Sequence, residues 1–464
     1  MVEASVWTAQ PGGQRLFLNC PIFEVLFHGT RGCAKTDALL MAFAQFCGQG
    51  YGDAWRGILF RNTYKQLEEV IAKVYRWLYP VFDGFHYNRG EHTCYWKTGE
   101  TLVLRHMDRD ADYWNYHGHE YPFVGWDELT NWATPVVYHK MKSCCRSSVE
   151  GLPRMYRATT NPYGRGHNWV KAYFIDPAPE GVIVEDEIEI GDGHKMTLKR
   201  THVKGHYREN MALMKADPEY PAKIAQGKDP MVQRAWLEGD WDIVAGGMFD
   251  DIWSPHDHVI PEPALPQKVY IFRAFDWGSS KPYSVGWYIE SDGATQIGGR
   301  AYPRGSLIRF AELYGSTGQP NEGTRETAHQ IADRILAREQ QFGRKVHPGP
   351  GDGIWDGSRG KSIADQMAEK GVHFQNPDMK QKDRVAGWEK VRQALQAARD
   401  WPPEKPGLWV AETCRHFIRT VPVLPRDEAK PDDVDSEAED HVADEVRYAC
   451  MRRDVRAKVE RFRL

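Results

Sequence analysis

The 464-residue chain lacks a long hydrophobic run. Its longest apolar stretch covers residues 38–44, far short of the roughly 20 residues that a membrane helix needs, so we expect no membrane span. The first residues have neither the basic start nor the apolar stretch of a signal peptide. The 8 cysteines form no CxxC pair, and only Cys144 and Cys145 are adjacent. We therefore expect buried thiols in a reducing compartment.

The sequence also lacks an excess of either charge. Its 60 Lys and Arg face 64 Asp and Glu, a net charge of -4, which by itself gives no support to a nucleic-acid partner. Ten acids and one lysine, however, are concentrated in residues 427–445, so the rest of the second half is net basic. A solvated acidic loop is the ordinary interpretation of such a run. A basic surface around an acidic, metal-neutralised site is nevertheless compatible with binding DNA phosphates.

The length exceeds what one hydrophobic core usually organises, so two domains are expected. Residues 1–248 alternate short apolar strands with amphipathic helices, which predicts an α/β fold with a mainly parallel sheet. Prolines cluster in residues 249–267, where we expect an interdomain linker. Residues 268–464 contain further strands and a helix at 324–341, which predicts a second α/β or α+β domain.

A glycine-rich segment follows the first strand and opens a helix. Its sequence, HGTRGCAKT, matches the pattern GxxxxGK[ST] except that Ala34 replaces the second glycine. In such a loop backbone N–H groups bind phosphate, Lys35 reaches the β- and γ-phosphates, and Thr36 can hold Mg²⁺. The Cβ of Ala34 could crowd the phosphates if that residue needs a positive φ. The nucleotide-binding candidates of the loop are Gly29, Thr30, Arg31, Gly32, Cys33, Ala34, Lys35 and Thr36.

Two carboxylates follow the apolar strand at 123–126. Asp127 is the candidate for the Mg²⁺ shell, and Glu128 is the candidate that orients and polarises the attacking water. Together with the loop they predict an ATPase site. Three small polar residues end another strand and suit the sensing of a γ-phosphate: Thr159, Thr160 and Asn161.

Aspartates occur at three places in the second half where elements begin or end. They are Asp276 at the end of an apolar strand, Asp352 and Asp356 ahead of a helix-like segment, and Asp440 and Asp444 one turn apart on the last helix. Three acids from separate elements can hold two divalent ions about 4 Å apart, which activate water and stabilise the leaving oxygen in phosphodiester cleavage. Mg²⁺ and Mn²⁺ prefer such oxygen ligands. The pattern predicts a metal-dependent nuclease.

Taken in order, these segments resemble the large terminase subunit of tailed bacteriophages, the motor that packages DNA into proheads. The resemblance implies a P-loop ATPase domain of the ASCE type followed by an RNase H-like endonuclease domain. It covers nearly the whole chain and rests on residues 28–36, 61–64, 123–130, 157–162, 236–242, 272–278, 349–352, 361–364 and 440–448.

The resemblance also implies residue roles in the first domain. Lys35, Thr36, Asp127 and Glu128 match the ATPase motifs, and residues 159–161 match the segment that couples hydrolysis to DNA movement. An arginine from a neighbouring subunit is expected to stabilise the transition state. The candidate for this arginine is Arg146, with Arg154 in reserve, although Arg146 could equally be an ordinary surface residue.

For the nuclease, the roles of Asp276 and Asp444 carry over directly. The second acid stays open between Asp352, which fits the family motif better, and Asp356, which fits if its strand runs four residues further. Asp440 and His441 are then expected at the rim of the metal site.

The resemblance implies a packaging motor that moves double-stranded DNA with ATP and Mg²⁺ and cuts it with Mg²⁺ or Mn²⁺. Implied partners are the portal protein, the small terminase subunit and further copies in a pentameric ring, all in the host cell cytoplasm. Two alternatives stay open. One is a helicase-nuclease of DNA repair, and the other is a DNA-tethering assembly protein whose loop has lost hydrolysis, to which Ala34 points.

Overall fold

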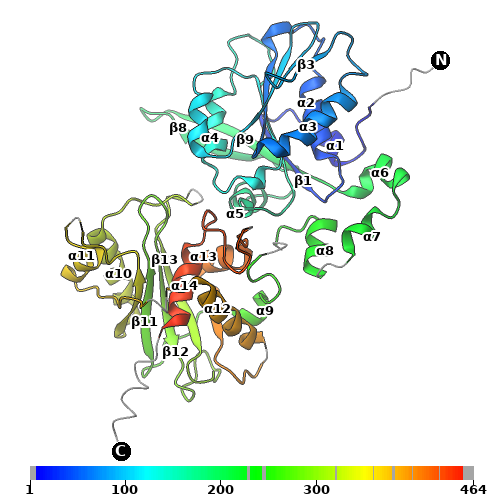
Figure 1. The fold of residues 1–464 in the computed structure, drawn as a ribbon. Helices are drawn as coiled ribbons and strands as arrows, with labels where there is room; N and C mark the ends of the chain where they lie inside the picture. Colours follow the sequence, from blue (N-terminus) through cyan, green and yellow to red (C-terminus); the bar gives the residue numbers. More distant parts are fainter. Residues whose placement is uncertain are drawn as a thin grey trace, which may run out of the picture. The chain divides into compact units, whose positions relative to one another are not determined.

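The computed structural model describes residues 7–226, 230–242, 247–318, 321–358, 360–378, 382–399, 401–427 and 429–452. The chain divides into two compact units, Met1–Ala245 and Gly246–Leu464 (Figure 1). No helix in the described ranges is long and apolar enough to cross a bilayer.

The first unit contains a nine-stranded sheet of order β3-β4-β5-β2-β6-β7-β1-β9-β8. Six neighbouring strands run parallel, which confirms the predicted fold class. They are β5 (Thr101–His106), β2 (Arg56–Arg61), β6 (Phe123–Trp126), β7 (Met155–Thr159), β1 (Glu24–Gly29) and β9 (Lys195–Gly205). Three antiparallel strands extend the edges: β3 (His86–Asn88), β4 (Thr93–Tyr95) and β8 (Val184–Glu189).

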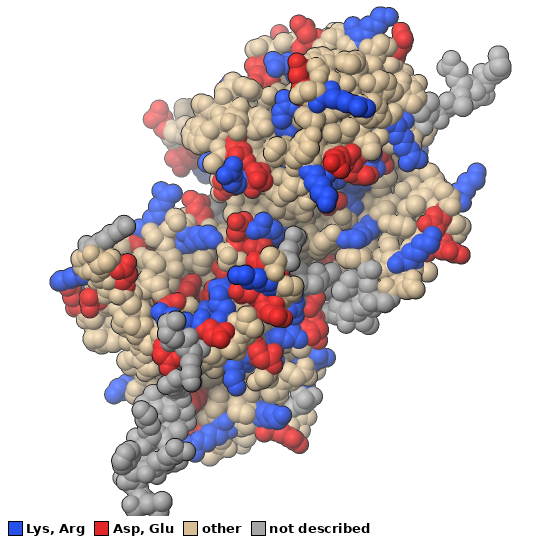
Figure 2. All heavy atoms as spheres, viewed as in Figure 1, with Lys and Arg blue, Asp and Glu red and all other residues tan. Residues whose placement is uncertain are grey.

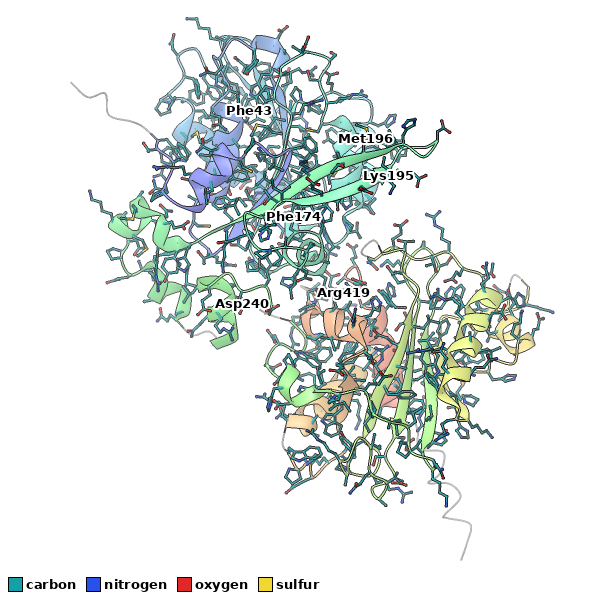
Figure 3. All side chains as sticks on the ribbon, turned by 180° about the vertical axis from the view of Figure 1, so that it is seen from behind. Phe43, Phe174, Lys195, Met196, Asp240 and Arg419 are labelled. Carbon is teal, nitrogen blue, oxygen red and sulfur yellow. The ribbon has the colours of Figure 1, made fainter. Side chains whose placement is uncertain are left out.

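Helices cover both faces of this sheet (Figure 1). One face carries α1 (Gly13–Asn19), α2 (Lys35–Ala44) and α3 (Tyr64–Trp77), and the other carries α4 (Val136–Met141) and α5 (His167–Val170). Three further helices follow β9: α6 (Met211–Ala216), α7 (Tyr220–Ala225) and α8 (Pro230–Leu237). Figure 3 shows Phe43 of α2 in the first core, where its ring stacks on Trp55 at 5.2 Å. Because parallel strands end at one edge, the segments after β1, β2, β6 and β7 meet there.

The second unit contains a six-stranded sheet of order β10-β15-β13-β12-β11-β14. Its strands are β10 (Val259–Ile260), β11 (Tyr270–Asp276), β12 (Ser284–Glu290), β13 (Leu307–Tyr314), β14 (Val346–Asp352) and β15 (Leu408–Ala411). β11, β12 and β13 form an antiparallel meander, whereas β14 runs parallel to β11 and β15 runs parallel to β13. This mixed sheet between two helical layers agrees with the expected RNase H-like class.

The two faces of β11 alternate between two cores. Ile271 and Phe275 pack with α10 (Ala328–Phe342) and α11 (Ile363–Glu369). Phe272 and Ala274 pack with α12 (Arg384–Arg399), α13 (Arg415–Thr420) and α14 (His441–Met451). Asp276 follows Phe272 and Ala274 at the same two-residue spacing, so its side chain points to the face of the sheet that α14 covers.

The segment expected as a linker belongs largely to the second unit. Met248, Phe249 and Ile252 are buried in the core beneath α12, and Ile260 lies on β10, which pairs with β15. Between them lies α9 (Pro255–His258). The division of the chain falls between residues 245 and 246, because these apolar side chains pack into the second core.

The acidic run at 427–445 is not a solvated loop throughout. Figure 2 shows acidic and basic side chains interspersed over the visible face of each unit. Glu439 and Glu445, however, are buried and pair with Arg419 and Arg309, each at 2.6 Å. The expected solvated loop is therefore wrong for Glu439 and Glu445, which are neutralised by arginines inside the fold.

Candidate nucleotide and nuclease sites

The glycine-rich segment forms a tight loop between β1 and α2. Gly29 and Gly32 have φ of +133° and +83°, and a Cβ on Gly29 would lie 2.0 Å from the carbonyl oxygen of Gly205. Ala34, at the position directly before α2, has φ of 58°. The structure therefore gives Ala34 the positive φ at which we expected its Cβ to crowd the phosphates. The loop leads the chain into α2 with the free N–H groups of its first turn, a ready anion site.

Lys35 is held inside the loop by oxygen atoms. Its Nζ donates to the carbonyl oxygen of Thr30 and to Oδ1 of Asn161, both at 2.8 Å, and the side chain is buried. The Sγ of Cys33 also faces inward, 3.1 Å from the same carbonyl oxygen. An ammonium held by carbonyl and amide oxygens can exchange these partners for phosphate oxygens, which bind it more strongly.

Asp127 lies at the end of β6 and is completely buried. Its carboxylate accepts hydrogen bonds from Thr36 Oγ1 at 3.0 Å and Thr159 Oγ1 at 2.5 Å. Arg61, the last residue of β2, forms an ion pair with it at 2.7 Å. The two expected Mg²⁺ ligands, Thr36 and Asp127, thus touch each other, whereas no role was expected for Arg61. Its position at the end of a neighbouring parallel strand was the signal that could have revealed it.

Glu128 has left-handed backbone, with φ of 58°, and its carboxylate accepts from Nδ2 of Asn161 at 3.1 Å. Asn161 therefore links Lys35 to Glu128 through the two ends of one amide. Thr160 instead bonds with Thr130 Oγ1 at 2.7 Å. Of the three residues expected to sense phosphate, two reach the site and the third fixes the turn after Glu128.

A pocket of about 340 Å³ opens over this loop, and Lys35, Thr36, Arg61, Glu128 and Asn161 are among its lining residues. Arg31 also lines it. The Arg31 guanidinium lies 3.5 Å from the ring centre of Trp236 and donates to the hydroxyl of Tyr163 at 2.5 Å.

The arginines expected to act in trans do not take part in this pocket. Neither Arg146 nor Arg154 belongs to the described residues that line it. Arg146 instead donates to the carbonyl oxygen of Gly118 on the surface.

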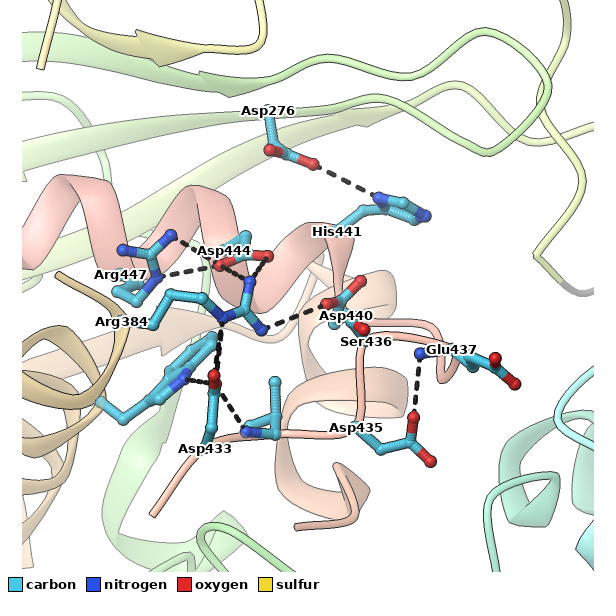
Figure 4. Close-up of polar contacts among 12 residues, drawn as sticks. Asp276, Arg384, Asp433, Asp435, Ser436, Glu437, Asp440, His441, Asp444 and Arg447 are labelled. Carbon is cyan, nitrogen blue, oxygen red and sulfur yellow. Dashed lines mark hydrogen bonds and ion pairs between the residues drawn. The ribbon is translucent and has the colours of Figure 1, made fainter. Parts of the chain in front are cut away.

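The second site forms where β11 and β14 end beside α14 (Figure 4). Asp276 and Asp352 are register partners on these parallel strands, Asp440 directly precedes α14, and Asp444 lies in its first turn. Asp356 is placed differently: it is exposed beyond β14, and its carboxylate accepts from the backbone N–H of Ser358. Of the two candidates for the second acid, only Asp352 therefore lies in the strand register of Asp276.

Two of these carboxyl groups hold their protons unusually strongly. Burial raises the pKa of Asp276 to about 6, and the nearby charge of Asp444 adds to this. Burial raises the pKa of Asp440 to about 7, again with a contribution from Asp444. The Nδ1 of His441 lies 3.3 Å from Asp276. The negative charge of Asp444 therefore acts on both neighbouring carboxyl groups.

Basic and hydroxyl groups already contact the other two acids. Tyr448 donates to Asp352 at 2.6 Å, and Lys382 pairs with Asp352 at 3.0 Å. Burial alone would raise the pKa of Asp352, but these two hydrogen bonds lower it below its ordinary value.

Asp444 is held from two directions. Arg384 pairs with it at 3.0 Å, and Arg447 donates to it through Nε at 2.8 Å. Sequence reasoning missed Lys382 and Arg384, because no spacing connects them to the acids. Arg447 and Tyr448 belong to the resembling segment 440–448, but no role was predicted for them. Their three- and four-residue spacing from Asp444 places them on the same side of the helix, which could have indicated a role at this site.

The acids are suited to divalent cations, although they do not form a finished metal site. Within the described residues, no group of three or more His, Cys, Asp or Glu is arranged to hold a metal ion. The buried Asp440 carboxylate nevertheless accepts no hydrogen bond from any described residue, and its one ion pair is to Arg384 at 3.6 Å. Under-compensated carboxylate oxygens are the donors that Mg²⁺ and Mn²⁺ prefer. The residues therefore fit a divalent ion.

Comparison with solved structures finds large terminases. The HK97 bacteriophage large terminase is 9% identical with a TM-score of 0.43, over 94% of each chain. The large terminase of a thermophilic bacteriophage, also solved with ADP and with ATP-gamma-S, is 15% identical with a TM-score of 0.40, over 95% of this chain and 98% of that chain. The P22 large terminase nuclease domain is 16% identical with a TM-score of 0.32, over 46% of this chain and 96% of that chain.

No protein-family model matches the chain, and no curated protein matches it. The solved structures named above are large terminases or a domain of one.

Proposed function

We propose that this chain is a DNA-packaging motor of the large terminase kind, which uses ATP to move double-stranded DNA into a prohead and cuts the DNA concatemer. One observation carries the proposal. A single chain carries both a phosphate-binding loop and a cluster of four aspartates where β11 and β14 end beside α14. In the loop, Asn161 connects Lys35 with the carboxylate of Glu128. A translocase that does not cut DNA has no need of the second cluster.

In the motor unit, the N–H groups that begin α2 and the Nζ of Lys35 bind the phosphates. Glu128 orients the attacking water, and Asn161 senses the γ-phosphate, because it contacts both Lys35 and Glu128. Thr36 and Asp127 would hold Mg²⁺, and a bound Mg²⁺ would supply positive charge next to the transferred phosphoryl group. Arg61 pairs with the buried Asp127 and compensates its negative charge.

In the nuclease unit, Asp276, Asp352 and Asp444 hold Mg²⁺ or Mn²⁺, with Asp440 and His441 at the rim. Divalent ions held there would activate water and stabilise the leaving oxygen of the phosphodiester. The sheet supports this arrangement, because adjacent parallel strands place Asp276 and Asp352 side by side. Tyr448 fixes the orientation of Asp352 through its hydroxyl.

A packaging motor further requires a portal protein, a small terminase subunit and a ring of copies, with the host cell cytoplasm as its place of work. Arg146 remains the candidate for an arginine that acts on a neighbouring copy. Its exposed position on the first unit is compatible with this, because a residue that acts in trans has to be accessible.

The decisive experiment compares Lys35→Ala and Asp276→Asn in a prohead packaging assay. DNA-stimulated ATP hydrolysis and Mg²⁺- or Mn²⁺-dependent plasmid cleavage are measured alongside. Lys35→Ala should lose ATP hydrolysis and packaging but keep DNA cleavage. Asp276→Asn should keep ATP hydrolysis but lose DNA cleavage. Undiminished cleavage by Asp276→Asn would remove Asp276 from the nuclease site.

The same assays separate the two alternatives. Unwinding in a strand-displacement assay would indicate a helicase-nuclease of repair. DNA binding without any ATP turnover would indicate a tethering protein. The left-handed Ala34 is the feature that favours this second alternative, because at a positive φ its Cβ is expected to crowd a bound phosphate.

A further inference from the structure

Two basic side chains from one short segment reach the aspartate cluster of the second unit. Lys382 Nζ lies 3.0 Å from Asp352 Oδ1. Arg384, two residues later, places Nη1 3.0 Å from Asp444 and Nη2 3.6 Å from Asp440 (Figure 4). The Nη2 atom is buried and has no hydrogen-bond partner within the described residues. The segment thus presents two positive charges to three of the four acids.

These two cations differ from the third one at the cluster. Arg447 belongs to α14 itself, and its side chain is only 1% exposed. Its guanidinium is packed 4.2 Å from the ring centre of Tyr448 and 5.3 Å from that of Trp388. The side chains of Lys382 and Arg384 are 37% and 31% exposed. Arg447 is therefore a fixed part of the site, whereas the other two can leave it.

Arg384 also has a second partner to which it can remain bound. Its Nε donates to both oxygens of Asp433, at 3.0 and 3.1 Å. Asp433 is itself fixed by Trp388 Nε1 at 2.7 Å and by the backbone N–H of Val434 at 2.8 Å. The guanidinium can therefore release Asp444 and Asp440 without losing its ion pair with Asp433.

We propose that Lys382 and Arg384 are displaceable counter-ions of the nuclease carboxylates, which hold the site closed until a divalent cation replaces them. The proposal rests on the nuclease function proposed above. Buried carboxylates close to each other need positive charge, and ammonium or guanidinium groups supply it in the absence of metal. The same carboxylate oxygens cannot bind a side-chain cation and a divalent ion at once. The two side chains therefore compete with the metal and set its apparent affinity.

The test is calorimetric titration of Mn²⁺ into the full chain and into the variants Lys382→Gln and Arg384→Gln. Each variant should bind Mn²⁺ about fivefold more tightly, since it has lost one competing ion pair. Arg392→Gln is the matched control. Arg392 lies on the same helix α12 and carries the same charge, but it pairs with Asp251 at 2.5 Å, so its removal should leave the Mn²⁺ affinity unchanged.

A second measurement needs no variant. Acetylation of lysines, followed by mass spectrometry, should modify Lys382 several-fold faster when Mn²⁺ is present, because its Nζ is then released from Asp352. Lys361, which pairs with Glu369, is the internal control and should not respond. This measurement decides the matter if Arg384→Gln fails to fold.

The outcomes distinguish this inference from the proposed function. Absence of Mn²⁺ binding by the unaltered chain would overturn both. Mn²⁺ binding with equal affinity in all variants, or a Lys382 reactivity that ignores Mn²⁺, would overturn the counter-ion role alone and leave the nuclease proposal standing.

Discussion

Single residues in left-handed backbone shape the phosphate-binding loop. Ala34 has φ of 58°, a conformation that costs an L-residue with a Cβ roughly 1–2 kcal/mol. Its carbonyl oxygen accepts from the side-chain amide of Gln14, which helps to hold this geometry. The loop therefore stores strain at the residue directly before Lys35.

Ala34→Gly should stabilise the first unit by about 1 kcal/mol, because glycine adopts positive φ without the Cβ penalty and loses only part of that gain to its freer unfolded state. Urea unfolding measures the change. Ala38→Gly is the control: it lies inside α2 with ordinary helical backbone and should cost about 1 kcal/mol. A loss of stability in Ala34→Gly would show that the loop is not strained there.

Asn161 is the residue whose contacts join the two sides of the nucleotide site. Asn161→Ala should lower the rate of ATP hydrolysis roughly 100-fold, the usual effect of removing one preorganised polar contact. Nucleotide affinity should change little, because Lys35 keeps its place beside Thr30. Steady-state kinetics and nucleotide titration separate the two effects. Asn131→Ala, an amide that contacts Gln66 instead, should leave both unchanged, and equal losses of rate and affinity in Asn161→Ala would contradict the linking role.

At the scale of elements, strand ends decide which acids belong to the second site. The sequence left Asp352 and Asp356 open, because both follow glycine and proline residues that hide the end of the strand. In the structure β14 ends at Asp352, and Gly353 then turns the chain with φ of +73°. Asp356 falls beyond this turn. The choice depends on register with β11, which is a long-range property that local sequence does not contain.

The first site was easier to predict for the same physical reason. Lys35, Thr36, Asp127 and Glu128 each stand in a short local pattern at a strand end, so the sequence identifies them directly. Arg61 also ends a strand and begins the segment 61–64, but its contact with Asp127 becomes recognisable only when the fold brings β2 beside β6. Arg384 stands in no such pattern and becomes recognisable only when the fold brings α12 beside α14.

Helix α4 contributes a half-buried histidine that makes the first unit sensitive to acid. Burial lowers the pKa of His139 from its ordinary value of 6.5 to about 4, and the nearby Lys142 adds to this lowering. Its Nε2 has no hydrogen-bond partner within the described residues, and its ring lies 5.0 Å from that of Tyr173. Below pH 6.5 the unfolded chain therefore takes up a proton that the folded chain refuses.

The free energy of unfolding should consequently fall as the pH decreases from 6.5 towards 4, with His139 responsible for a loss of about 2 kcal/mol at pH 5 and for none above about pH 7.5. Urea unfolding at these two pH values measures the difference. In His139→Phe the fall should be smaller by that amount, whereas replacement of the exposed His86 by Gln should not alter it. An identical fall in His139→Phe would show that this histidine is protonated in the folded unit.

At the scale of the whole molecule, the two-unit division is where sequence and structure differ most. The prolines at 261, 263 and 266 suggest a linker, because proline suits extended connections. Phe249 and Ile252 belong to the same segment, and Met248 directly precedes it. Their three- and four-residue spacing places these apolar residues on one side of a turn and in the second core. The composition of the segment shows the prolines, whereas only the packing in the structure shows which of the two units contains the apolar side chains.

This difference leads to a prediction about fragments. A fragment of residues 246–464 should fold by itself and keep the nuclease activity, since it retains both cores of the second unit. A fragment that begins at residue 268 loses Phe249 and Ile252 from the core and β10 from the edge of the sheet. Each fully buried large apolar side chain contributes about 1.5–3 kcal/mol, so the shorter fragment should unfold at a clearly lower temperature or not fold at all.

Circular dichroism melts of the two fragments make the comparison, with residues 1–245 as a third sample that should melt independently. Equal melting temperatures for the two fragments of the second unit would mean that residues 246–267 add nothing to its core and that the chain has a true linker there.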